Sequence, residues 1–224
     1  MNFVHIKSTH DRWYEPAIAF YKNKLDHLVT EDASVFARSL KTDKTQHDFV
    51  FIVGIEDDAI VSLATAHYEA TTNVGFIVYL LAQHSQDCEA CLKTTLEQIE
   101  YELNRISNHL HGRDVNFFMF ESTFESNDVD EETAKKINFR RHFLVDNGYE
   151  KQTEITYLQP SLDRNGKPIP LDLYVKGNIP LTKDIFGTSV KSCYILKYVY
   201  ANQIPRSIIY PLLVKMGLRK EHRP

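Results

Sequence analysis

The feature that most constrains the fold is a run of three apolar segments separated by short polar turns. Residues 49–55 (FVFIVGI), 59–68 (AIVSLATAHY) and 74–82 (VGFIVYLLA) are rich in β-branched and aromatic residues, as strands are. Residues 56–58 (EDD) form a tight acidic turn between the first two segments. Turns this short join antiparallel neighbours, so the segment predicts an antiparallel meander.

A helical period follows the meander. Apolar residues recur at intervals of four and three within 87–109, at Leu92, Leu96, Ile99, Leu103 and Ile106. Elsewhere the pattern predicts strands at 2–6, 115–121, around Tyr157 and at 171–175, and helices at about 11–28, 31–40, 132–146, 194–200 and 208–216. This order indicates a mixed α/β (α+β) fold over residues 1–177, with 178–224 as a helical extension packed on it.

Charge and composition exclude several classes of protein. With 26 lysines and arginines against 30 aspartates and glutamates, the net charge is −4, which argues against a duplex-binding protein. The longest apolar run, at 76–82, is too short to span a bilayer, and residues 1–7 show no signal peptide. Three cysteines suit a reducing compartment. We therefore expect a cytoplasmic protein with no nucleic-acid and no membrane partner.

Three stretches resemble the GNAT (N-acetyltransferase) superfamily, in particular its bacterial members. The first is residues 75–82 (GFIVYLLA), which lead straight into a helix, and the second is 138–149 (NFRRHFLVDNGY), a helix ending in Gly-Tyr. The third is 157–162 (YLQPSL) followed by 171–175 (LDLYV). The resemblance covers residues 2 to about 176. It implies a mostly antiparallel central sheet flanked by helices, with 74–82 and 115–121 as splayed parallel strands.

The resemblance also implies acetyl-coenzyme A as co-substrate and a set of residues that bind it. Leu80, Leu81 and Ala82 would contact the pantetheine arm through their main chain, and Asn138 would lie close to that arm. The loop that follows would wrap the pyrophosphate at a helix start, where backbone amides attract anions. This loop consists of Gln83, His84, Ser85, Gln86, Asp87 and Cys88.

The sequence departs from the family at three functional positions. The phosphate loop, residues 83–90, contains none of the glycines that let the backbone approach a phosphate closely. Leu144 stands where many members have the tyrosine that protonates the leaving thiolate. Val78 stands where a carboxylate often serves as general base. Either other residues move the protons, or transfer has been lost.

Two residues are the predicted catalytic substitutes. Glu121 ends a predicted strand, where its carboxylate could deprotonate an amine. Tyr79 lies on the strand 74–82 and could donate from its hydroxyl. His67 and Tyr68, at the end of 59–68, are further alternatives.

Cys88 and Cys91 form a CxxC pair at a helix start, which is typical of dithiol redox proteins. With His84 they could also hold zinc. The meander that precedes the pair does not fit a thioredoxin-like fold, and a second paired motif for zinc is absent. We therefore expect neither chemistry and no metal.

The sequence thus predicts an acyl-coenzyme A-dependent N-acyltransferase that moves an acetyl group to an amine by direct attack. The acceptor would be a small-molecule or peptide amine, and the protein would be a monomer or a homodimer. The alternative is a catalytically degenerate GNAT-fold protein with a binding or regulatory role.

Overall fold

The computed structural model describes residues 1–24, 31–41, 49–83, 88–123, 130–162, 166–180 and 182–220. It divides into two units, Met1–Val115 and Asn116–Pro224, whose positions relative to each other are not determined. The expected pairing of 74–82 with 115–121 would join the two units. Among the described residues, no helix is both long and apolar enough to cross a membrane.

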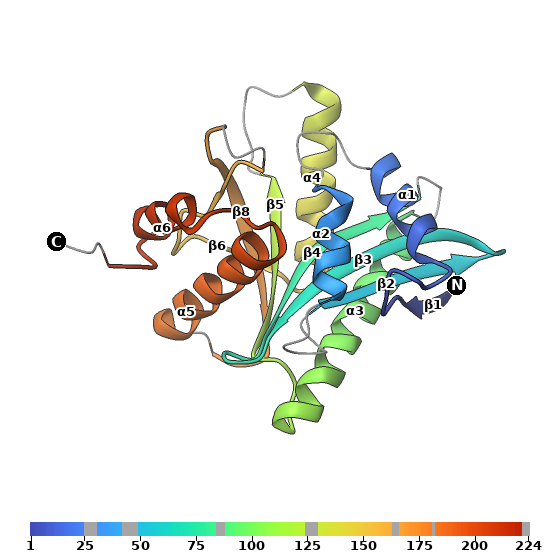
Figure 1. The fold of residues 1–224 in the computed structure, drawn as a ribbon, viewed down its shortest axis with the longest axis horizontal. Coiled ribbons are helices and arrows are strands. Elements are labelled where there is room, and N and C mark those ends of the chain that lie inside the picture. Colours follow the sequence, from blue (N-terminus) through green and yellow to red (C-terminus); the bar gives the residue numbers. More distant parts are fainter. Residues whose placement is uncertain are drawn as a thin grey trace. The chain divides into compact units, whose positions relative to one another are not determined.

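The first unit contains the predicted meander. Its strands β1 (Asn2–His5), β2 (Phe49–Glu56), β3 (Ala59–Glu69) and β4 (Val74–Ala82) pair antiparallel in that order (Figure 1). The acidic turn between β2 and β3 places Asp57 and Asp58 at φ 46° and 57°. Positive φ at both central residues is the geometry that matches the twist of a hairpin. The prediction of three antiparallel strands joined by tight turns is confirmed.

Helices cover both faces of this sheet. Helices α1 (Tyr14–Lys24) and α2 (Ala33–Leu40) bury Tyr21 and Phe36 against the face that carries Leu63 and Leu81. Helix α3 (Cys88–His111) packs on the opposite face, where Thr95 donates a hydrogen bond to Ser62 at 2.7 Å. Adjacent strand residues point to opposite faces, so Ser62 and Leu63 assign the two layers.

A buried polar cluster fixes the start of β4. Asn73 has φ 54° and is 2% exposed. Its Oδ1 accepts hydrogen bonds from Tyr68 and Ser107, each at 2.6 Å, and its Nδ2 donates to the carbonyl of Asp114 at 3.0 Å. These three hydrogen bonds offset much of the cost of burying the amide and tie the β3–β4 turn to the end of α3.

The second unit is a smaller antiparallel sheet with helices. Strand β8 (Ile169–Gly177) pairs with β5 (Phe117–Thr123) and β6 (Glu150–Gln152), and also with the short β7 (Leu158–Gln159). Helix α4 (Glu131–Asp146) begins at Asp130, whose carboxylate accepts from the Thr133 amide at 2.9 Å. The C-terminal part consists of α5 (Lys183–Tyr194), a π-helix η1 (Ile195–Ala201) and α6 (Arg206–Lys215).

The C-terminal part differs from the sequence-based expectation. Helix α5 was not predicted, and the expected α-helix at 194–200 is the π-helix η1. Of the strand expected around Tyr157, at 153–158, only Leu158 lies in a strand, the short β7, and β6 was not foreseen. Apolar periodicity does not separate α from π turns, because both place apolar residues on one side.

Candidate functional site

Strand β4 carries an irregularity at the predicted site. Thr65 pairs with Tyr79 and Ala66 with Ile77, so Val78 is the extra residue of a β-bulge. A bulge interrupts the ladder and turns neighbouring side chains, and such bulges are over-represented beside active sites. Val78 is therefore part of a local distortion next to Tyr79.

The other residues expected to bind the cofactor fall into three groups. Leu80, Leu81 and Ala82 are buried and paired with β3, and the Gln83 amide donates to the Val61 carbonyl at 2.8 Å. His84, Ser85, Gln86 and Asp87 lie outside the described residues. Cys88 is the first residue of α3, and Asn138 is exposed on α4.

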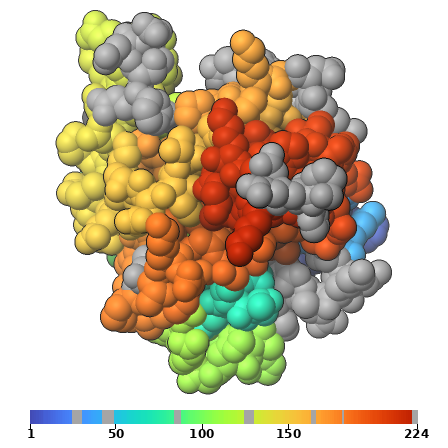
Figure 2. All heavy atoms as spheres, turned by 90° about the vertical axis from the view of Figure 1, so that its left-hand side faces the viewer, coloured from blue at the N-terminus to red at the C-terminus, as the bar shows by residue number. Residues whose placement is uncertain are grey.

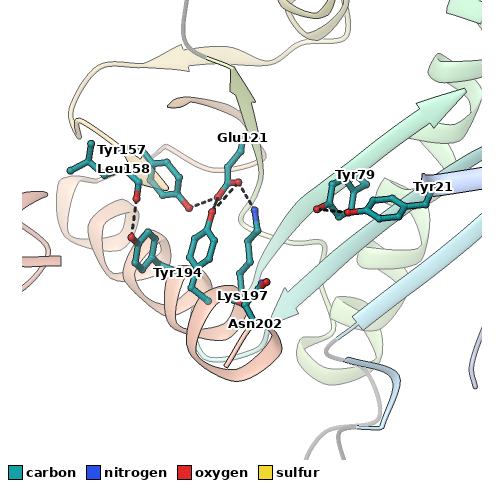
Figure 3. A network of polar contacts seen from close by, with 9 residues as sticks. Tyr21, Tyr79, Glu121, Tyr157, Leu158, Tyr194, Lys197 and Asn202 are labelled. Carbon is teal, nitrogen blue, oxygen red and sulfur yellow. Dashed lines mark hydrogen bonds and ion pairs between the residues drawn. The ribbon is translucent and has the colours of Figure 1, made fainter. Parts of the chain in front are cut away.

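Tyr79 belongs to a hydrogen-bonded group in the first unit that also contains Tyr21 and Glu31. The Tyr21 hydroxyl donates to the Tyr79 oxygen at 3.1 Å (Figure 3). The Glu31 amide in turn donates to the Tyr21 oxygen at 2.6 Å, and the Glu31 side chain is hydrogen-bonded to Tyr79. Helix α1, the start of α2 and strand β4 thus converge on two phenols and one carboxylate.

The environment of this group decides its chemistry. Burial, followed by the Glu31 carboxylate, raises the pKa of Tyr79 well above its usual value. Burial also raises the pKa of Tyr21. Both phenols therefore stay protonated at neutral pH. Tyr79 can exchange hydrogen bonds there but has little tendency to give up its proton permanently.

Glu121 lies at the centre of a second buried group, in the second unit. Its Oε2 is 2.5 Å from Nζ of Lys197, and its Oε1 accepts hydrogen bonds from the hydroxyls of Tyr157 and of Tyr198, the latter at 3.1 Å (Figure 3). Each of these four side chains is at most 8% exposed. Nearby, the Tyr194 hydroxyl donates to the Leu158 carbonyl at 2.8 Å.

This arrangement limits what Glu121 can do. The Glu121 carboxylate accepts hydrogen bonds from one ammonium and two phenols, which take up most of its lone pairs. Burial, followed by the Glu121 charge, raises the pKa values of Tyr157 and Tyr198, so these donors keep their protons. With three buried donors already on its oxygens, Glu121 has little remaining capacity to accept a proton from an amine.

The π-helix η1 explains how Lys197 and Tyr198, which are consecutive, reach the same carboxylate. The Asn202 amide donates to the Lys197 carbonyl at 3.0 Å, a bond across five residues. The wider π turn reduces the angle between consecutive side chains compared with an α-helix. Single π turns in proteins are often found at functional sites.

Sequence reasoning missed Glu31 and Lys197. Glu31 is only the first residue of the helix predicted at 31–40, and Lys197 lies within the helix predicted at 194–200. Lys197 stands between apolar residues, as a buried cation of an amphipathic segment would, and this is the one signal that could have pointed to it. For Glu31 the sequence contains no such signal.

The thiol of Cys91, the second cysteine of the CxxC pair, does not have the environment of a reactive thiol. The Cys91 thiol is partly buried, lies 3.8 Å from the Val61 carbonyl, and has a pKa raised by burial. A thiol of raised pKa is a poor nucleophile and a poor metal ligand. No group of three or more metal-ligating side chains occurs among the described residues.

A hollow of about 420 Å³ lies in the second unit. It is lined by α5, by the turn after α6 and by residues 154 and 155. Helices α5 and α6 form much of the orange and red surface in Figure 2. Its walls include Lys183 and Lys191 but also Glu154 and Asp184, so they favour neither charge. None of the predicted site residues lines it.

Comparison with solved structures defines the class of fold. The protein is similar to a chain from Bacteroides thetaiotaomicron that is ascribed to the GNAT family of acetyltransferases, with a TM-score of 0.59 and 17% identity. The match covers 90% of this chain and 99% of the Bacteroides chain. The aminoglycoside 6'-N-acetyltransferase of Enterococcus faecium covers 82% of this chain and is itself covered in full, with a TM-score of 0.54 and 13% identity. The ribosomal-protein-S18-alanine N-acetyltransferase of Escherichia coli matches with a TM-score of 0.53 and 11% identity, and the match covers 82% of this chain and 97% of the enzyme.

The chain therefore has the fold of the GNAT acetyltransferases, and the fold class expected from its sequence is confirmed. No protein-family model matches the chain, and no curated protein matches it by sequence.

Proposed function

We propose that the protein is an acyl-coenzyme A-dependent N-acyltransferase that moves an acetyl group from acetyl-coenzyme A to an amine. The observation that carries the proposal is the likeness of fold to acetyltransferases, which extends over 90% of the chain in one comparison and about four fifths in two others. A fold can host several activities, so the residues of the site must support the same chemistry.

The described residues support a site on and after β4. In this proposal the main chain of Leu80, Leu81 and Ala82 binds the pantetheine arm. The segment from Gln83 to Cys88 binds the pyrophosphate. The bulge at Val78 supports this assignment, because an interrupted ladder leaves backbone groups that can bind a ligand.

The two predicted catalytic residues are not equivalent in this proposal. Tyr79 is half-buried beside the bulge, and we place it nearest the reacting amine. The carboxylate of Glu121 is held in place by Lys197, Tyr157 and Tyr198, so we do not assign it the role of the base. Direct attack by the amine on the thioester needs no covalent enzyme intermediate, and correct positioning supplies much of the rate.

The proposed acceptor is a small-molecule or peptide amine. The two named enzymes of similar fold act on an aminoglycoside and on a ribosomal-protein alanine, which are one acceptor of each kind. The three cysteines form no disulfide, which fits the proposed cytoplasmic location. The protein would work as a monomer or homodimer and without a metal.

A thiol-release assay tests the proposed function. The purified chain is incubated with acetyl-coenzyme A and, in separate reactions, with an aminoglycoside, a polyamine and a peptide with an N-terminal alanine. We expect release of coenzyme A thiol, together with an acetylated product of matching mass, for at least one amine. Absence of both in every reaction would contradict acyl transfer. Binding of acetyl-coenzyme A without transfer would then favour the binding or regulatory alternative.

A further inference from the structure

Glu31 is the described carboxylate that is hydrogen-bonded to the proposed catalytic Tyr79. It is 6% exposed, whereas the Tyr79 side chain is partly exposed on β4 with its hydroxyl in a buried environment that raises its pKa. A substrate that reaches the Tyr79 oxygen would not need to contact Glu31. The Tyr79 hydroxyl lies between them, hydrogen-bonded to the Glu31 side chain and, at 3.1 Å, to the Tyr21 hydroxyl.

The donors and acceptors of this group form a consistent chain. The Glu31 amide donates to the Tyr21 oxygen, and the single proton of the Tyr21 hydroxyl has two acceptors, the Tyr79 oxygen at 3.1 Å and the Glu31 carbonyl at 3.4 Å. With that proton directed to Tyr79, the single proton of the Tyr79 hydroxyl is directed to the Glu31 carboxylate. A phenol oxygen has two lone pairs, and Tyr21 occupies only one of them. The other lone pair of Tyr79 is left to accept an N–H from an incoming amine.

We propose that Glu31 is a further positioning residue of the acyl transfer, which receives the proton of the acceptor amine through the hydroxyl of Tyr79. This inference rests on the proposed function. It assigns the proton acceptor to a residue of the first unit in place of Glu121, whose oxygens are held by Lys197 and two tyrosines.

The proposed step is balanced. The amine nitrogen attacks the thioester carbonyl carbon, a C–N bond forms, and the C–S bond breaks. As nitrogen loses a proton to the Tyr79 oxygen, the Tyr79 proton passes to a carboxylate oxygen of Glu31. The leaving thiolate takes a proton from solvent, and Glu31 returns its proton to solvent. The products are the acetylated amine and coenzyme A, and both residues regain their starting state.

A relay of this kind fits the environment of Tyr79. The phenol passes a proton on in the same step in which it receives one, so it never has to exist as a free phenolate. Burial and the neighbouring carboxylate oppose ionisation of Tyr79, and this disfavours stepwise proton loss but not concerted transfer. Positioned proton acceptors contribute factors of about 100 to 10,000 to enzymatic rates.

Steady-state kinetics of four variants test the relay, with acetyl-coenzyme A and whichever amine of the panel the wild type acetylates. Glu31→Gln keeps the shape of the side chain but removes the base, and Tyr79→Phe removes the relay hydroxyl. We expect each to lower kcat by a factor of about 100 or more, with little change in KM for acetyl-coenzyme A. Glu31→Asp, which restores a carboxylate, should recover part of the loss.

Tyr14→Phe is the matched control. It also deletes a phenol hydroxyl of the first unit, from a side chain that is 6% exposed and packs against the Phe51 ring. We expect its kcat to stay within a factor of about 3 of the wild type, far below the effect of losing a positioned base. Thermal melts of all four variants show whether the fold is kept.

The outcomes separate the relay from the proposed function. If the wild type acetylates an amine and folded Glu31→Gln or Tyr79→Phe retains its kcat, the relay is overturned and the transferase stands. An equal loss of kcat in Glu31→Gln and Glu31→Asp, together with a raised KM for acetyl-coenzyme A, would also overturn the relay. Such a result would indicate a structural defect rather than the loss of a base. If the wild type acetylates no amine of the panel, the proposed function fails, and the relay fails with it.

Discussion

Glu121 and Lys197 place two opposite charges in the interior of the second unit, each about 6% exposed. The desolvation penalty of such a pair is large, and its attraction offsets that penalty only when the geometry and the surrounding hydrogen bonds are good. Here Tyr157 and Tyr198 supply those hydrogen bonds. At the scale of single residues, the group therefore acts chiefly to fasten η1 to β5.

Removing one partner of this pair should destabilise the second unit strongly. Lys197→Met leaves the Glu121 charge buried without a cation, and we expect a loss of about 3–5 kcal/mol in the free energy of unfolding. Replacing both residues in Glu121→Gln/Lys197→Met should cost less than Lys197→Met alone. Urea titrations followed by circular dichroism measure both. Lys135→Met, at an exposed pair with Glu131, is the control and should show no measurable change. A Lys197→Met variant as stable as the wild type would contradict this account of the pair.

The buried phenols predict a loss of stability at alkaline pH. Burial raises the pKa of Tyr21, Tyr79, Tyr157, Tyr194 and Tyr198 in the folded protein above the value near 10 of unfolded tyrosine. Above pH 10 the unfolded chain loses protons that the folded chain retains. The free energy of unfolding must then fall, by about 1.4 kcal/mol per pH unit for each such tyrosine. Below pH 10 the contribution of these tyrosines to the free energy of unfolding does not change with pH.

Urea midpoints between pH 9 and 11, together with phenolate absorbance at 295 nm, check this prediction. We expect midpoints that are steady up to about pH 10 and fall beyond it, since tyrosine ionises near 10 when exposed. Part of the phenolate absorbance should develop only as the protein unfolds. Titration of every tyrosine near pH 10 in the folded protein would show that these hydroxyls are not buried.

Secondary-structure elements differ in how closely the sequence determines them. The meander follows from its runs of strand-forming residues and its short turns, and α3 follows from its apolar stripe at helical spacing. Helix α5 and η1 cannot be predicted in this way, because their boundaries depend on contacts between residues that are far apart in sequence. The contact of Lys197 with Glu121 is one example. Long-range contacts of this kind leave no periodic pattern.

Two glycines in the second unit test the local geometry of its elements. Gly148, after α4, has φ +85°, which side chains rarely adopt, although a Cβ there would meet nothing closer than 3.8 Å. Gly148→Ala should therefore lower the free energy of unfolding by about 1–2 kcal/mol through backbone strain. Gly187 lies inside α5, and a Cβ there would touch Leu218 at 3.7 Å, an ordinary contact. Gly187→Ala should raise the same quantity by about 0.4–1 kcal/mol.

The opposite signs make this pair informative, because each variant controls for the other. Both replace glycine with alanine in the same unit, and urea midpoints under identical conditions give both values. Destabilisation by Gly187→Ala would contradict the helical geometry of α5. An unchanged midpoint for Gly148→Ala would contradict the left-handed end of α4.

For the molecule as a whole, the sequence allowed the class of fold to be predicted but only part of the site. Strand and helix order identified the fold now seen in three acetyltransferase structures. Tyr79 was predicted as a candidate, but its link to Glu31 depends on how α1 and the start of α2 pack against β4. Glu121 was predicted from its place at a strand end, and its ion pair with Lys197 could not be foreseen without the fold.

The central claim is that this fold binds an acyl-coenzyme A. Thermal melts with acetyl-coenzyme A, with coenzyme A and with ATP test it most directly. A ligand at about a hundred times its dissociation constant adds about 2.7 kcal/mol, a shift of several degrees for a chain of this length. The account predicts such a shift with both coenzyme A species and none with ATP. No shift with either coenzyme A species at millimolar concentration would contradict it.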